Sequence, residues 1–305
     1  MRAGAFFSNL SSGGQILLLI GLVLAGTVFS IVLASGVSIL VWGTDVLTQG
    51  AAVGSLNLDF LRTFQMISQV GIFILPPFIF GLLVNSSSFN FLGFRRPDYR
   101  HLIAAVLIIA VAGPTINFLV EWNEGLRLPG FLKSIEQWMR NSEETATRLT
   151  KQFLETSKTS DLIINFIMIA ILPAIGEELL FRSALIGILR KVFKGIHWPV
   201  IISALIFSAF HLQFFGFVPR FALGLVLGYL FVWSGSVWVP MLAHLVNNGV
   251  VVVVSWLSVN KIIESNVDDL ADFGSWIAVV VSVFACILIL YLTYRTRPVE
   301  EMQTE

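Results

Sequence analysis

Long runs of apolar residues alternate with short polar segments along most of the chain. A helix needs about 20 mainly apolar residues to cross the hydrocarbon core of a bilayer. Eight runs reach or approach this length, at residues 15–42, 63–85, 102–122, 161–190, 197–212, 214–233, 236–257 and 275–294. The pattern predicts an all-α integral membrane protein with about eight transmembrane helices, of which 197–212 is the shortest. The first run is longer than the apolar part of a secretory signal, so we expect it to be retained as an anchor.

The one long polar connection, residues 123–160, carries apolar residues at helical spacing. In its first part these are Phe131, Leu132, Ile135, Trp138 and Met139, and in its second part Ala146, Leu149, Phe153 and Leu154. Between the two, Asn141 followed by Glu144 is typical of a helix start. The segment therefore predicts two short amphipathic helices on the outer membrane interface, serving either as a structural cap or as a lid over a substrate entrance.

Composition agrees with a membrane protein. Apolar residues make up 56% of the chain, charged residues 12%, and the mean hydropathy is +0.85, whereas soluble domains carry roughly 25% charged residues. Nineteen basic residues balance nineteen acidic ones, so the charge gives no indication of a nucleic-acid partner. The single cysteine, Cys286, excludes a disulfide within the chain and a multi-cysteine metal site.

Basic residues in the short loops predict the orientation. They occur at 95–100, at 190–194 and at Arg295 and Arg297, whereas acidic residues occur at Asp45 and Asp59 and, after the seventh run, at Glu264, Asp268, Asp269 and Asp272. Eight spans bring all the basic segments to one side together with both termini. Because basic loops stay in the cytoplasm, we expect a multi-pass plasma (inner) membrane protein with both termini cytoplasmic.

The chain divides into four parts on this interpretation. Residues 1–122 form three N-terminal spans, 123–160 the extracytoplasmic amphipathic loop, 161–257 a core of four spans, and 258–305 the last span and tail.

Three polar clusters lie within the apolar runs of the core. They are Glu177-Glu178 with Arg182, then His211, then His244 with Asn248. Ionisable groups inside a bilayer are costly and therefore mark functional sites. Together the clusters predict a polar cavity within the membrane. Arg220, near the start of another span, is more typical of an anchor that extends to the interface.

The spacing of residues within each cluster indicates which side chains can pair with one another. Glu178 and Arg182 are one helical turn apart and can form an ion pair, which leaves Glu177 unpaired about 100° around the helix. An unpaired carboxylate shielded from water is a candidate general base. By helical rise, Glu177 and His211 each lie about 20 Å above the cytoplasmic interface, whereas His244 lies only about 10 Å above the turn that precedes it. On this estimate His244 lies less deep in the membrane than Glu177 and His211, so the third cluster agrees less well with a common site.

At these residues the sequence resembles the CPBP group of integral-membrane endopeptidases, the relatives of type II CAAX prenyl proteases that are also called the Abi family. That family has Glu-Glu-x-x-x-Arg, Phe-x-x-x-His and His-x-x-x-Asn on successive helices. Here the same motifs are Glu177-Glu178 to Arg182, Phe207 to His211 and His244 to Asn248, in the same order. The resemblance covers about residues 161–257.

The resemblance implies a role for each matched residue. Glu177 would activate water, with His211 holding the water or sharing its proton. His244 and Asn248 would stabilise the oxyanion, and Arg182 would support Glu178. Zinc accepts His and carboxylate ligands, so a zinc site formed by Glu177, His211 and His244 stays open beside a metal-free glutamate mechanism. The substrate would be a membrane protein or peptide in the lipid bilayer, and no prenyl group is indicated.

Other chemistries and functions are less favoured. No histidine is followed by glutamate, which excludes a His-Glu-x-x-His zinc helix, and no aspartate lies in the interior of a span to form an aspartyl dyad. A proton-coupled transporter could use the same ionisable residues, but no inverted repeat is detectable. A non-catalytic binding or immunity scaffold is the other alternative.

Overall fold

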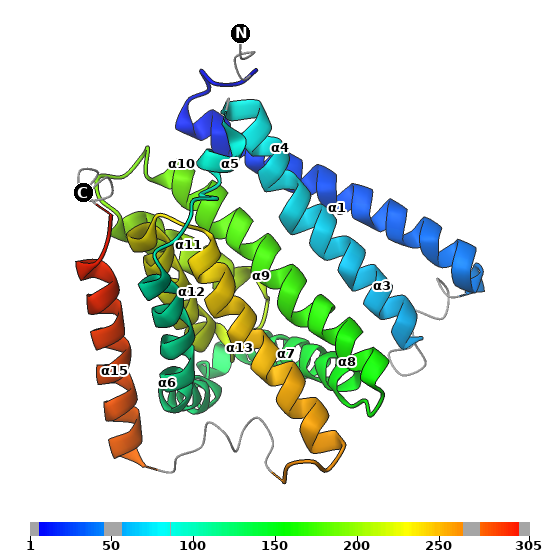
Figure 1. Ribbon diagram of the computed structural model, residues 1–305. Helices are drawn as coiled ribbons and strands as arrows, with labels where there is room; N and C mark the ends of the chain where they lie inside the picture. The colour runs from blue at the N-terminus through cyan, green and yellow to red at the C-terminus, as the bar shows by residue number, and fades with distance from the viewer. Residues whose placement is uncertain (1–5, 46–56, 86, 265–274, 299–305) are drawn as a thin grey trace.

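The helices of the chain form a membrane-type bundle (Figure 1). The computed structural model describes residues 6–45, 57–85, 87–264 and 275–298, and over these residues it contains helices and no strand. The acidic residues Asp268, Asp269 and Asp272, used above for orientation, lie outside these ranges. The elements are α1 (Ser12–Trp42), α3 (Leu58–Gln69), η1 (Val70–Ile74), α4 (Leu75–Val84), α5 (Ser88–Phe91), α6 (Tyr99–Glu124), η2 (Gly130–Leu132), α7 (Lys133–Leu154), α8 (Thr159–Asn165), η3 (Phe166–Ile171), α9 (Leu172–Glu177), η4 (Glu178–Ile186), α10 (Gly187–Leu189), α11 (His197–Phe210), α12 (Phe217–Ser234), α13 (Trp238–Val259) and α15 (Trp276–Arg295).

The all-α multi-pass membrane fold is confirmed. In the described part of the chain, seven helical stretches are long and apolar enough to cross a membrane. The remaining predicted span, the fifth along the chain at 197–212, is α11, an apolar helix of 14 residues. At about 1.5 Å per residue it reaches only about 21 Å, so it is shorter than the roughly 30 Å hydrocarbon core. Directly after His211 the chain turns, and α12 packs back along α11.

Two helix groups flank a central set. Helix α1 packs along α3, η1 and α4 on one side, and α15 packs along α6 on the other (Figure 1). Between them lie α9 and η4, α11, α12 and α13, which contain the three motifs. The start of α1, the end of α15, α5 and α10 lie at one end of the bundle, and α7 lies at the opposite end.

Two glycines four residues apart, Gly224 and Gly228, let α12 pack closely against α11, as small residues at this spacing do between membrane helices. A Cβ atom on Gly228 would lie 2.8 Å from Val200 Cγ1, and one on Gly224 would lie 3.0 Å from the Ala204 Cβ. This close approach places the end of α11 beside the cavity-lining part of α12.

Wider, π-helical turns interrupt the long helix of residues 159–189 on both sides of α9. Such turns free main-chain carbonyls and are common at functional sites. Polar side chains from neighbouring helices use them: the Ser203 hydroxyl donates to Phe181 O in η4 at 2.9 Å, and the Asn248 amide donates to Ile169 O in η3 at 2.9 Å. These contacts fix α11 and α13 against the helix that carries the glutamates.

The amphipathic segment differs from its prediction, because α7 is one continuous helix instead of two. Asn141 does not cap a second helix: its side chain accepts from Gln137 Nε2 at 3.0 Å, and its carbonyl accepts from Thr145 Oγ1 at 2.8 Å. Both bonds lie within α7, and the helix continues through the position where a break was expected.

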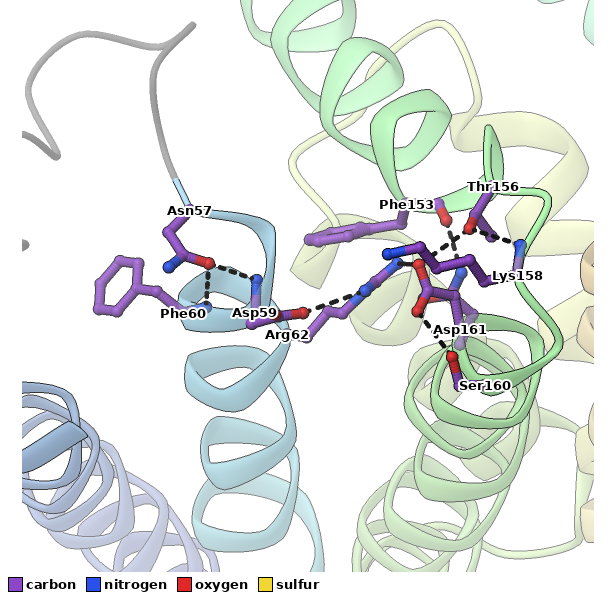
Figure 2. A network of polar contacts seen from close by, with 10 residues as sticks. Asn57, Asp59, Phe60, Arg62, Phe153, Thr156, Lys158, Ser160 and Asp161 are labelled. Carbon is purple, nitrogen blue, oxygen red and sulfur yellow. Dashed lines mark hydrogen bonds and ion pairs between the residues drawn. The ribbon is translucent and has the colours of Figure 1, made fainter. Parts of the chain in front are cut away.

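A polar network holds the end of α7 to the spans. Arg62 on α3 lies between Asp59 and Asp161, 3.2 Å from a carboxylate oxygen of each (Figure 2). Asp161 also accepts from the Thr156 hydroxyl at 2.8 Å, in the connection between α7 and α8. The Arg62 side chain is buried, so this ion pair joins α3 to the segment that ends α7.

Candidate active site

Glu178, Arg182 and His244 form a buried hydrogen-bonded group. Nη1 of Arg182 donates to Glu178 Oε1 at 3.0 Å, and Nδ1 of His244 lies 2.8 Å from the same oxygen. None of the three side chains is more than 4% exposed. The predicted pairing of Glu178 with Arg182 is thus confirmed, and His244 joins it from α13.

Glu177 lies beside this group with a free carboxylate oxygen. Its Oε2 atom is buried, has no hydrogen-bond partner, and lies 4.0 Å from Nε2 of His244. The imidazole of His244 therefore stands between two carboxylates, with Nδ1 toward Glu178 and Nε2 toward Glu177. Glu177 is the unpaired member of the two, as the spacing predicts.

His211 follows directly after the last residue of α11. Its Nδ1 lies 2.9 Å from Phe207 O, and its ring makes an edge contact with the Phe207 ring. Because a carbonyl oxygen can only accept, Nδ1 carries the proton, and Nε2 of the neutral ring is left as an acceptor. The first and last residues of the Phe-x-x-x-His motif thus fix one another.

The depth mismatch of the third cluster disappears in the structure. The turn that begins α13 is recessed, since Ser236 is fully buried and donates its hydroxyl to Arg95 O at 2.7 Å. Val237 N also donates to Gly93 O at 2.9 Å. The loop before α6 therefore covers this turn, which raises His244 to the level of the glutamates.

Asn248 uses its side chain in two contacts. Its Nδ2 donates to Ile169 O, as described above, and its Oδ1 accepts from Asn247 Nδ2 at 3.0 Å. An amide nitrogen carries two N–H groups, so the bond to Ile169 leaves one further donor.

One cavity of about 570 Å³ brings these side chains together. The four predicted catalytic residues, Glu177, His211, His244 and Asn248, all line it. Its other lining residues are Gln65, Gln69, Ala146, Leu149, Thr150, Phe153, Met168, Ile169, Pro173, Phe207, Arg220, Leu223 and Asn247. Helix α7 contributes its apolar face to this wall, so it covers the cavity.

Most residues that line the cavity were not predicted as part of the site, and three of them are of particular interest. Gln65 and Gln69 come from α3, outside the three motifs, and Arg220 was interpreted as an interfacial anchor. The structure corrects that interpretation, because the Arg220 side chain turns back onto the loop that precedes α12 and lines the cavity. A cation within an apolar run was the available signal.

The side chains do not assemble the zinc site that the sequence leaves open as an alternative. Among the residues that the structure describes, no three His, Cys, Asp or Glu side chains are grouped so that they could hold a metal ion. Glu177, His211 and His244 line one cavity, yet Nδ1 of each histidine is engaged elsewhere, by Phe207 O and by Glu178.

Fold and site together define a multi-pass membrane protein with a buried acid–imidazole cavity. Residues 159–250 match the sequence model of the family described as type II CAAX prenyl endopeptidase Rce1-like. An uncharacterized protein, YpbD of Bacillus subtilis (strain 168), is 32% identical over 92 residues, which cover 29% of this chain and 44% of that protein. No solved structure gives a significant match. The matched segment contains all three motifs, so the resemblance is confirmed over it and points to a membrane protease.

Proposed function

We propose that the protein is an intramembrane endopeptidase that hydrolyses a peptide bond of a membrane-associated protein or peptide. The observation that carries this proposal is the buried, unpartnered Oε2 of Glu177 beside His244, in a cavity that His211 also lines. A fixed carboxylate base next to imidazoles is what activation of water for attack on an amide requires.

In the proposed reaction, Glu177 takes a proton from water as the water oxygen attacks the carbonyl carbon. His211, with Nε2 free to accept, holds that water. The carbonyl oxygen becomes an oxyanion, which the remaining N–H of Asn248 stabilises; His244 adds a donor at Nε2 when both of its ring nitrogens carry a proton. Breakdown of the tetrahedral intermediate breaks the C–N bond, and the proton held by Glu177 passes to the leaving amine.

Glu178 and Arg182 are proposed as positioning residues. The ionised carboxylate accepts from Nδ1–H of His244 and so aims Nε2 at the side of the cavity where Glu177 lies. Because Arg182 neutralises Glu178, the pair adds no net charge to the buried site. No step of this mechanism runs through a metal, since the side chains do not assemble a three-ligand site.

We also propose that both chain ends lie in the cytoplasm of the plasma membrane. The loop at 95–100, the loop at 190–194 and both described chain ends lie at one end of the bundle, and basic segments favour the cytoplasmic side. Helix α7 and the cavity that it covers would then face outward.

Membrane peptidomics on matched cells tests the function. Cells would carry wild type, Glu177→Gln, or Glu144→Gln, which makes the same change at an exposed position on α7. Protein amounts and melting temperatures must be equal. We expect peptide fragments of the substrate in cells with wild type or Glu144→Gln, and none of these fragments in cells with Glu177→Gln. No wild-type fragments, with a phenotype that survives Glu177→Gln, would favour a scaffold; Glu177-dependent flux without fragments would favour a carrier.

A further inference from the structure

Arg220 is a cation of the cavity wall that, among the described residues, forms no close ion pair with a carboxylate, although Glu143 and Glu177 are near enough to interact with its charge. Its Nη1 donates to Gln213 O at 3.2 Å, and its Nη2 donates to Gln213 Oε1 at 2.6 Å. Both acceptors are neutral, and in the described part of the chain no ion pair joins Arg220 to an acid. Arg182, the other arginine of the site, is by contrast paired with Glu178. A guanidinium has more N–H donors than these two bonds use.

A glycine makes room for this guanidinium. A Cβ atom on Gly216 would lie 2.2 Å from Nη1 of Arg220 and 2.7 Å from its Cζ. The backbone of Gly216, with φ −103°, is open to any residue. The absence of a side chain at Gly216 thus leaves the space that the guanidinium occupies, and an added Cβ would displace the end of the arginine side chain.

The guanidinium lies where two cavities meet. Arg220 lines both the 570 Å³ cavity that contains Glu177 and a second cavity of about 500 Å³ between α7 and α13. The second cavity is also lined by Thr150, Ser255 and Ser258. Two acids, Glu143 and Glu155, also line the second cavity, and Glu143 accepts a hydrogen bond from the backbone N–H of Phe215 at 3.1 Å.

We infer that Arg220, held by Gln213, binds a carboxylate of the substrate beside the bond that is hydrolysed. The inference rests on the proposed endopeptidase function. The fork of a guanidinium matches the two oxygens of a carboxylate, and carboxylates are the anionic groups of an unmodified peptide. The carboxylate can belong to the C-terminus of the substrate or to an Asp or Glu side chain.

Binding to the full-length Glu177→Gln protein in detergent tests the inference without turnover. The probes are a set of peptides with one fixed apolar anchor and a randomised segment. Each is made as a C-terminal acid, as a C-terminal amide, and as an amide with one internal Asp. We expect at least one carboxylate form to bind about tenfold more tightly than the neutral amide, and the form that does so identifies the source.

Two further changes in the same background remove the preference if the inference holds. Arg220→Gln deletes the charge, and Gly216→Ala displaces the guanidinium while keeping it; both should bring the affinity ratio to about 1. Arg148→Gln, which removes an exposed cation of α7 that lines neither cavity, should leave the ratio unchanged. Equal affinity for acid and amide peptides, or a preference that survives Arg220→Gln, overturns the inference.

Cleavage of the same peptides by the wild type separates this inference from the proposed function. If carboxylate peptides bind preferentially but none is cleaved, the endopeptidase function is contradicted and the carboxylate-binding role of Arg220 is still supported. Cleavage without a preference supports the endopeptidase and contradicts the role of Arg220.

Discussion

Nδ1 of His244 lies 2.8 Å from Oε1 of Glu178, the same oxygen to which Arg182 donates. One carboxylate oxygen thus joins α13 to the helix that carries both glutamates. Oε2 is buried without a hydrogen-bond partner in both Glu178 and the neighbouring Glu177, but Glu177 approaches His244 Nε2 only to 4.0 Å and, in the described part of the chain, has no contact like the two that Glu178 Oε1 makes. Two glutamates that are adjacent in sequence therefore have different surroundings, and their substitutions should have different effects.

Glu178→Gln should destabilise the protein, and Glu177→Gln should not. The first change leaves the buried Arg182 charge unpaired, which costs about 3–5 kcal/mol. The second removes a group that forms no hydrogen bond through Oε2. Thermal unfolding in detergent measures both. A Glu178→Leu, Arg182→Met double variant, which removes both charges, should recover most of the loss; a melting temperature unchanged by Glu178→Gln would contradict the buried ion pair.

Asn248→Ala should lower turnover by about a hundredfold, as loss of an oxyanion donor does. It also removes the bond to Ile169 O, so we expect a stability loss of about 1 kcal/mol. Asn247→Ala is the matched control, because Asn247 only donates to Asn248 Oδ1, and its effect on kcat should be several-fold smaller. The proposed oxyanion role fails if the two variants lower kcat equally in a peptide-cleavage assay.

Peptide cleavage should persist after treatment with a zinc chelator. This expectation follows from the arrangement of the side chains, in which no three possible ligands of the described residues are grouped. Activity of the purified protein would be compared before and after dialysis against chelator, with an inert salt as control. Loss of activity that zinc restores, and that magnesium does not, would show that binding of a metal rearranges the site.

Asp161→Asn should loosen the end of α7. The change weakens the ion pair with Arg62 at 3.2 Å and the bond from Thr156 (Figure 2). Loss of about 1.4 kcal/mol corresponds to roughly tenfold faster hydrogen exchange of the amides in the last turns of α7. Asp59→Asn is the control, because that side chain is largely exposed and its pairing contributes less. Equal exchange in the two variants would mean that α7 is held by other contacts.

Low pH should loosen the first turns of α7, because protonation of Glu136 weakens its bonds to Arg140 and Leu128. The pKa of the Glu136 carboxyl lies below its ordinary value of 4.5, first because the Arg140 side chain hydrogen-bonds to it and then because Leu128 N–H does. A depressed pKa stabilises the fold above pH 4.5, and this contribution disappears as the pH falls through the lower folded value. Trp138 packs on Phe214, so its fluorescence reports loosening of these turns. The Trp138 signal is obtained by subtracting the fluorescence of Trp138→Phe from that of the wild type. Glu136→Gln should abolish the pH step.

The sequence predicted most of the fold because the spans are long and their apolar character is continuous. It also predicted the motifs and the pairing of Glu178 with Arg182, since both residues lie on one helix at fixed spacing. Spacing along one helix does not predict which side chains on different helices are in contact. The bond from His244 to Glu178 depends on how deeply α13 is set, and that depth depends on the loop at Gly93 and Arg95 that covers its first turn.

The errors of prediction have similar causes. Asn141 followed by Glu144 is a common helix start, but at this position the Asn141 side chain bonds within the preceding turn and the helix continues. Arg220 was assigned to the interface because a long side chain near a helix end usually extends outward. Its inward direction depends on Gly216 and Gln213, which lie in a loop whose path the hydrophobic pattern does not determine.

Three lengths of polypeptide form the walls of the cavity: α3 with Gln65 and Gln69, α7, and the segment 159–250. Glu177, His211, His244 and Asn248 lie within 159–250, the segment that matches the protease family, whereas the roof formed by Ala146, Leu149 and Phe153 lies before it. Mutation can therefore reshape the roof without touching the residues assigned to hydrolysis. We therefore expect an exchange of α7 between proteins that share the matched segment to change the substrate that the proposed endopeptidase selects, without a change in the proposed catalytic residues.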